Sequence, residues 1–286
     1  MILLSSGTLY TWGLSRVFRA AADIGFHGME VLIDNRPDTH DPRYLAGLQE
    51  EYKLPIKVLH SPFVKVKSWK TGPVGSLKKT VELAQSLGIS TVVTHPPFKL
   101  KDIAVLFRGA VHGKLRILLP WPVKDGAYRF FAEGGIRQLE RETGVTIAVE
   151  NMPRRIYMGM TIPLFWFNSA EELQRFDHLT LDTTHVGTWE FDLLDFYNQI
   201  RSRIRHVHIS NFNGKEHRTI DDGHLPLSVL LTKLREDQYN GAVSIEGDPE
   251  AFAHQTERTA RTELKKALSF CTAHLYEQEE PPLEIK

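Results

Sequence analysis

The amino-acid sequence predicts an α/β protein that forms a closed (β/α)8 barrel in a single domain. Eight short runs of β-branched and aliphatic residues punctuate the chain, and segments with apolar residues at helical spacing separate them. Strands that alternate with helices pair in parallel. Eight such units fill a chain of 286 residues as one barrel.

The predicted strands cover residues 2–6, 28–33, 55–60, 90–95, 145–150, 178–182, 204–210 and 242–246. The intervening segments repeat apolar residues every three or four positions, as Leu14 and Val17 or Leu77 and Val81 show, and Gly88 would end one of these helices. An open doubly wound sheet is the alternative fold. It is disfavoured because no Gly-rich phosphate fingerprint follows the first strand.

We expect the barrel to span residues 1–275 and the charged, Pro-containing residues 276–286 to form a C-terminal tail. Residues 96–126 form a connection much longer than the few residues usual between a strand and its helix. The run KLRILLPWP predicts an additional strand within it. Since this loop follows a strand, on the side where barrel active sites form, we expect it to cover a substrate.

Composition argues against several other classes of protein. The 35 acidic and 35 basic side chains balance, so no global field attracts nucleic acid. No uninterrupted apolar run approaches the roughly 20 residues that cross a bilayer, and the first ten residues lack the basic region of a secretion signal. A single cysteine, Cys271, excludes an internal disulfide, and a cytoplasmic location fits best.

Six of the eight runs end on a side chain that can bind a metal ion. These side chains are His60, His95, Glu150, Asp182, His208 and Glu246. A single histidine or acid at a strand end is usually a packing, capping or ion-pairing residue. Barrel closure, however, brings all six around one mouth, where carboxylates would repel one another without a cation. The coincidence therefore predicts a divalent metal site.

Two loops add further candidates, each with an acid and a histidine close together. Asp182 in LDTTHVG precedes His185 by three residues, and Asp222 precedes His224 in IDDGHLPL. An Asp at a strand exit commonly caps the following turn, so Asp182 has a structural alternative. With these additions the candidate ligands number nine. Mixed imidazole and carboxylate ligands suit Zn, Mn, Co or Fe, and the absence of thiolates argues against a closed structural zinc site.

The order of the motifs VLHSPF, VVTHPP, VENMP, LDTTHVG, HVHISN, GHLPL and SIEGDP resembles the xylose isomerase-like TIM-barrel superfamily. This superfamily includes sugar isomerases and epimerases as well as abasic-site nucleases of the endonuclease IV type. The resemblance places the common metal ligands on Glu150, Asp182, His208 and Glu246. It places the extra ligands of the nuclease's three-metal cluster on His60, His95, His185, Asp222 and His224, so one to three ions are expected.

The N-terminal third is more similar to the sugar isomerase/epimerase branch, with Glu30 at the end of the second strand. Nuclease-type members tend to have Asp-Arg-His-His where this chain has Asp222-Gly223-His224-Leu225, and a Tyr where it has Phe63. We therefore favour a sugar or sugar-phosphate isomerase or epimerase. The alternative is an abasic-site phosphodiesterase that acts on DNA.

In the favoured hypothesis, Glu150 and Glu246 transfer protons beside a metal-polarised carbonyl, and His185 holds a substrate hydroxyl. In the alternative, three metals activate hydroxide against a phosphodiester, and basic loop residues would contact the DNA backbone. These basic residues are Lys65, Lys67, Lys70, Lys99, Lys101, Arg108, Lys114, Arg116 and Lys124. A non-catalytic metal-binding barrel is the third hypothesis. It predicts missing ligands or missing acid/base carboxylates, and neither is seen.

The remaining histidines are predicted to be structural. His206 shares a strand face with His208 one layer deeper, which favours a hydrogen-bonded core role. His217 lies away from any predicted strand end, so we expect a surface or loop position.

Overall fold

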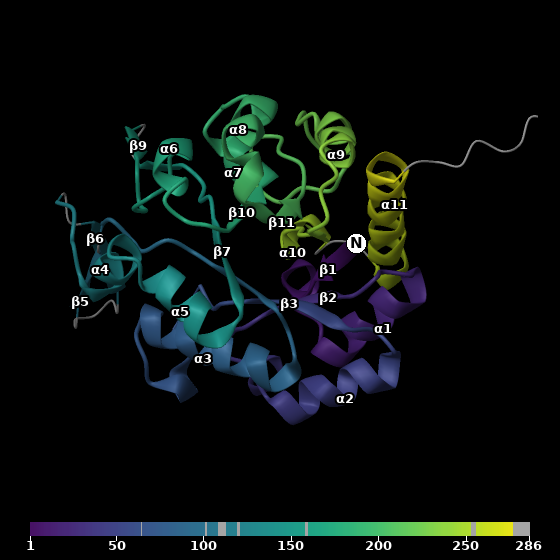
Figure 1. Ribbon diagram of the computed structural model, residues 1–286, viewed down its shortest axis with the longest axis horizontal. Coiled ribbons are helices and arrows are strands. Elements are labelled where there is room, and N and C mark those ends of the chain that lie inside the picture. Colours follow the sequence, from purple (N-terminus) through teal and green to yellow (C-terminus); the bar gives the residue numbers. More distant parts are fainter. Residues whose placement is uncertain are drawn as a thin grey trace, which may run out of the picture.

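The computed structural model describes residues 1–63, 65–100, 102–107, 113–118, 121–157, 160–252 and 256–276. Eight parallel strands close into a barrel that helices surround (Figure 1). The barrel strands are β1 (Ile2–Ser5), β2 (Met29–Leu32), β3 (Ile56–His60), β4 (Thr91–Thr94), β7 (Thr146–Glu150), β10 (Leu179–Asp182), β11 (Ile204–Ile209) and β12 (Ala242–Ile245). These are the eight predicted strands, so the predicted fold is confirmed.

Neighbouring barrel strands follow one another in chain order, and β1 closes the circle by pairing with both β2 and β12. Every residue of β1, β10 and β12 is buried. Burial on both faces is expected for parallel strands, since one face lines the barrel interior and helices cover the other. This explains why the strands are continuous apolar runs in the sequence, without the alternation of a half-exposed strand.

The helices are α1 (Leu14–Ile24), α2 (Pro42–Tyr52), α3 (Pro73–Leu87), α4 (Gly126–Ala132), α5 (Gly135–Thr143), α6 (Ala170–Leu173), α7 (Thr183–Thr188), α8 (Leu193–Ile200), α9 (Leu227–Glu236), α10 (Pro249–Phe252) and α11 (Glu257–Leu275). Short 3-10 helices are η1 (Ser6–Leu9), η2 (Pro37–Thr39), η3 (Lys67–Trp69) and η4 (Arg201–Arg203). The apolar spacing in α1 buries Leu14, Val17 and Phe18 against the core. Gly88 has the left-handed conformation (φ 68°) that ends α3, as predicted.

The long connection after β4 contains an antiparallel hairpin of β5 (Asp102–Phe107) and β6 (Gly113–Leu118). The additional strand predicted in KLRILLPWP is therefore present as β6. A second hairpin, β8 (Arg155–Tyr157) with β9 (Met160–Ile162), lies on the same side of the molecule (Figure 1). The two connections touch where Phe98 pairs with Phe165 in an isolated β-bridge.

Some sequence predictions fall outside the described residues. Lys101 and Arg108 are among them, as are residues 277–286, which form nearly all of the predicted tail. Within the described part of the chain, no helix combines the length and the apolar character that crossing a bilayer requires.

Candidate metal centre

The strand ends at the mouth of the barrel bring seven of the nine candidate ligands together. His60 ends β3, Glu150 ends β7, Asp182 ends β10 and His208 lies near the end of β11. The remaining three are His95 after β4, His185 in α7 and Glu246 after β12. Parallel strands end at one mouth, so residues far apart in the chain meet there.

Four potential ligands of one metal ion are Glu150, Asp182, His208 and Glu246. One potential ligand atom from each residue lies within 4.8 Å of those of the other three. The His208 Nδ1 atom lies at the centre of the group. It is 2.8 Å from Glu246 Oε2, 3.3 Å from Glu150 Oε1 and 3.7 Å from Asp182 Oδ2. Three carboxylates around one ring nitrogen form an acid-rich ligand set of the kind that binds a divalent cation.

Asp182 divides its two carboxylate oxygens between two roles. Oδ1 accepts the backbone N–H of His185 at 2.8 Å and caps the first turn of α7. Oδ2 is buried and has no hydrogen-bond partner within the described residues. A buried polar atom without a partner is costly, and a bound cation would satisfy this one. Capping and metal binding are therefore compatible, and the residues present fit a divalent ion.

A second group of potential ligands shares Glu150 with the first. Glu150 Oε2 lies 3.3 Å from His60 Nε2 and 3.1 Å from His95 Nε2. One ligand atom each from His60, His95 and Glu150 meets the same 4.8 Å limit. The two imidazoles either hold Glu150 in place by hydrogen bonding or bind a second ion with it.

His185 faces the same space from α7. Its Nδ1 atom is 2.8 Å from the backbone carbonyl of Asn151, which fixes the ring if Nδ1 carries the hydrogen. The other ring nitrogen, Nε2, faces Glu216 at 3.9 Å. His185 also forms a third potential ligand group with Asp182 and His217.

A family model described as xylose isomerase-like TIM barrel matches residues 18–272. The chain belongs to this family. It is 26% identical over 299 residues to an uncharacterized protein of Mycobacterium leprae, covering 95% of this chain and 96% of that protein. It is 25% identical over 285 residues to an uncharacterized protein of Mycobacterium tuberculosis, again covering 95% and 96%. The family predicted from the motifs is confirmed.

Solved structures are similar to this xylose isomerase-like barrel at low sequence identity. A D-psicose 3-epimerase with D-tagatose, from Clostridium cellulolyticum, superposes with a TM-score of 0.68 at 12% identity, covering 96% of this chain and 99% of that one. The 3-keto-D-glucoside 4-epimerase of E. coli has a TM-score of 0.66 at 17% identity, covering 94% and 98%. An AP endonuclease, family 2, from Brucella melitensis has a TM-score of 0.60 at 18% identity, covering 88% of this chain and 97% of that one. At these identities the likeness establishes the fold alone.

Opposite charges stabilise one another in the cluster of this family member. Burial alone would raise the pKa of Glu246, but the charge of His208 and its hydrogen bond lower that pKa to about 2. Burial would lower the pKa of His185, whereas the charges of Asp182 and Glu150 raise it to about 9. The cluster therefore favours positive charge at its centre, which a divalent cation also supplies.

A pocket of about 570 Å³ opens above the cluster of this xylose isomerase-like barrel. Glu150, His185 and Glu246 line it, so the predicted acid/base residues reach the space where a substrate would bind. Phe63 and Phe98 form part of an apolar wall, with ring centroids 5.8 Å apart.

Asp222 and His224 do not join the cluster. Arg218 binds the Asp222 carboxylate through Nη2 at 2.6 Å, and Asn213 donates to it at 2.7 Å. The His224 side chain is exposed and packs against Phe212. The loop after β11 thus holds Asp222 in a local ion pair, and neither residue occurs in the ligand groups of the described chain.

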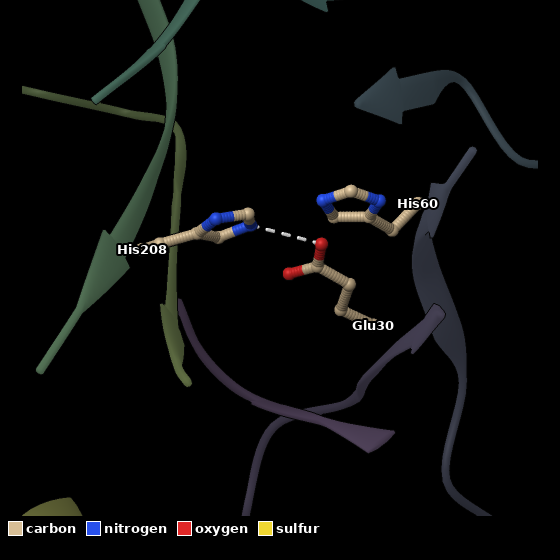
Figure 2. Close-up of side chains that lie close together, drawn as sticks. All are labelled: Glu30, His60 and His208. Atoms are coloured by element: carbon tan, nitrogen blue, oxygen red, sulfur yellow. Dashed lines mark hydrogen bonds and ion pairs between the residues drawn. The ribbon is translucent and has the colours of Figure 1, made fainter. Parts of the chain in front are cut away.

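Sequence reasoning missed two residues of the site. His217, expected in a surface or loop position, lines the pocket and lies close to His185, with ring centroids 5.2 Å apart. Glu30 was noted only as a strand-end residue, but it is fully buried and contacts His206 and His208 (Figure 2). In the structure Glu30 is the second residue of β2 and lies two positions before the strand end, so the sequence prediction misplaced it and the strand-end criterion that found the other ligands does not include it. His217 had no local signal either, because its place depends on how the loop folds back.

Proposed function

We propose that this chain is a divalent-metal-dependent sugar epimerase or isomerase, in which protons move next to a metal-polarised carbonyl. The observation that carries the proposal is the group of Glu150, Asp182, His208 and Glu246 beneath the pocket, including a buried Asp182 oxygen without a partner. The shared fold with the D-psicose 3-epimerase and the 3-keto-D-glucoside 4-epimerase supports it.

When bound by these four residues, the ion would supply Lewis acidity that polarises the substrate carbonyl and acidifies the neighbouring C–H bond. Glu150 and Glu246 then act as the proton-transfer pair. The two glutamates differ in the hydrogen bonds that their carboxylate oxygens accept. Glu150 Oε2 is held by His60 and His95. Glu246 Oε1 has, among the described residues, a single long hydrogen bond of 3.5 Å from Ser5 Oγ.

Glu246 is also the more accessible of the two, with 14% of its side chain exposed against 2% for Glu150. We therefore assign Glu246 the first proton abstraction and Glu150 the return of a proton from the other side. His185 holds a substrate hydroxyl with its pocket-facing Nε2 atom. In an epimerase one C–H bond breaks and one forms at the same carbon with inversion, which leaves Glu246 protonated and Glu150 deprotonated. Loss of a proton from Glu246 to water and uptake of one by Glu150 restore both groups, and this exchange carries deuterium from D2O to carbon.

The test is deuterium exchange. Metal-free protein is reloaded separately with Mn²⁺, Co²⁺, Zn²⁺ or Mg²⁺ and incubated in D2O with ketohexoses, keto-glycosides and their phosphates, and incorporation at carbon is followed by NMR. We expect incorporation with at least one pair of metal and sugar. Glu246→Gln should abolish it, because an amide does not accept the proton. Exchange that persists in Glu246→Gln removes this residue from the proton-abstracting role.

Asp222→Asn distinguishes the proposal from phosphodiester hydrolysis. Asp222 belongs to none of the ligand groups of the described residues and contacts the pocket only through Arg218, so its replacement should leave metal-dependent sugar exchange near the wild-type level. A three-metal nuclease that uses Asp222 as a ligand would instead lose an ion and its activity. Near three ions per chain, together with cleavage of abasic DNA and no sugar exchange, would overturn the proposed function.

A further inference from the structure

We propose that Glu30 is the positioning residue of the metal centre, which fixes the tautomer and orientation of His208 so that Nδ1 faces the ion. The inference rests on the proposed metal-dependent function and adds a residue outside the predicted ligand set. Glu30 lies in β2, which β1 and β12 separate from β11 around the barrel, and its side chain is fully buried.

The carboxylate of Glu30 joins two histidines of β11. Oε1 lies 2.9 Å from His208 Nε2, the bond drawn in Figure 2, and Oε2 lies 2.8 Å from His206 Nε2. An ionised carboxylate only accepts hydrogen bonds. Both Nε2 atoms therefore carry hydrogen and donate to Glu30.

The tautomer of His208 follows from this contact. A neutral imidazole carries one hydrogen, so a hydrogen on Nε2 leaves a lone pair on Nδ1. Nδ1 is the atom that points at Glu150, Asp182 and Glu246. Metal-binding histidines commonly donate their other ring N–H to a carboxylate, which orients the ring and raises its basicity.

His206 holds the other side of the same carboxylate. It lies one layer deeper in the barrel, fully buried, and its Nδ1 atom has no partner in the described part of the chain. Its bond to Oε2 leaves Oε1 of Glu30 directed at His208. His206 therefore anchors the orienting carboxylate, which extends the core role predicted for it.

A direct metal-binding role for Glu30 is the competing explanation. Glu30, His60 and His208 form a compact group of potential ligands, and Figure 2 shows both rings beside the carboxylate. For Glu30 and His208 to share an ion there, Nε2 would have to lose its hydrogen. Both Glu30 oxygens already accept a hydrogen bond from a histidine, whereas Asp182 Oδ2 on the Nδ1 side has no hydrogen-bond partner within the described residues, so the Nδ1 side is the one that fits a cation.

The experiment compares metal binding in the full-length wild type, Glu30→Gln and Ser244→Ala by competition with a chelator, using the metal alone. A glutamine side chain has one acceptor oxygen and one donor NH2 group, so it cannot accept from both histidines. We expect Glu30→Gln to bind about 10 to 100 times more weakly, the loss typical for removal of such a partner.

Ser244→Ala is the matched control. Ser244 is fully buried, lies opposite His208 in the β11–β12 register, and its hydroxyl has no partner within the described chain. Its replacement disturbs the same layer of the barrel without touching the Glu30 bonds. We expect unchanged metal affinity in this variant.

Imidazole 15N NMR reports which ring nitrogen of each histidine carries the hydrogen. A purely structural role of Glu30 would not change that position. In wild-type protein loaded with diamagnetic Zn²⁺, His208 should carry its hydrogen on Nε2, and Glu30→Gln should alter the tautomer of His208 or His206. If Glu30→Gln does not fold, the wild-type spectrum still decides, because hydrogen on Nδ1 of His208 overturns the inference.

The other outcomes are equally distinct. Wild-type affinity in Glu30→Gln, with the His208 tautomer unchanged, refutes positioning by Glu30. Loss of one whole ion from the stoichiometry would identify Glu30 as a ligand and also refute it. A wild-type protein that binds no divalent ion refutes the proposed function itself, which separates the two failures.

Discussion

Asp182 allows the capping and metal-binding roles of one carboxylate to be separated by two substitutions. Asp182→Asn keeps an oxygen that accepts the His185 N–H, and asparagine caps helices about as well as aspartate. Asp182→Ala removes the cap as well. In both variants the backbone of Asp182 stays bonded to the Asn151 side chain, at 2.8 Å through N–H and 3.0 Å through the carbonyl.

The expected magnitudes follow from these contacts. Loss of the cap in Asp182→Ala costs about 0.5 to 2 kcal/mol of unfolding free energy. Without metal, Asp182→Asn keeps the cap but loses the carboxylate charge that helps raise the pKa of His185, so it should be destabilised less than Asp182→Ala, which loses both. Both variants lose a residue that binds the metal directly. Removal of a residue that only hydrogen-bonds to a metal ligand weakens metal binding by up to roughly 100-fold, or about 2.8 kcal/mol of binding free energy, so these two substitutions should weaken it by more than that.

Urea unfolding of metal-free protein measures the first quantity, and chelator competition measures the second. The expected pattern is two variants that both fail to bind metal, of which the alanine variant is the more destabilised. Wild-type metal affinity in folded Asp182→Asn would refute the assignment of Oδ2 as a ligand atom. Equal stability of the two variants would refute the capping role.

Three further predictions concern the whole molecule. When the metal ion is present at 100 times its dissociation constant, removing it with a chelator should lower the unfolding free energy by about 2.7 kcal/mol and the Tm by roughly 5 to 10 °C. A Tm that calorimetry finds unchanged would contradict metal binding to the folded state. Burial raises the pKa of Cys271 to about 12, so at pH 8 native protein should react with a disulfide reagent far more slowly than unfolded protein. The stability that the protonated thiol contributes should be lost as pH rises from about 9 to 12. Equal reaction rates of native and unfolded protein would show that this thiol is accessible. Gly28→Ala should destabilise the barrel by about 1 to 3 kcal/mol, because the added Cβ would lie 2.7 Å from the Pro55 carbonyl oxygen. Gly47→Ala, at an uncrowded position on α2, should stabilise the barrel by up to about 1 kcal/mol. Urea unfolding that ranks the stabilities of the two variants in the reverse order would refute this reasoning.

The sequence by itself determined the barrel strands and most of the candidate metal centre. Strand runs and helical spacing are local patterns, and eight alternating units leave one closed parallel arrangement. Strand-end placement then put His60, Glu150 and Asp182 at one mouth, because parallel strands all end on the same side. The six predicted strand-end ligands meet there for that reason, and His185 joins them from α7.

Only the tertiary structure decided how individual atoms are used. Asp222 follows no strand directly, and the ion pair with Arg218 keeps it outside the cluster. Glu30 and His208 are 178 residues apart, so their contact depends on barrel closure and side-chain packing, which no local pattern specifies. The division of the Asp182 oxygens between cap and cluster is likewise set by the rotation of one side chain, because that rotation depends on every group packed around it.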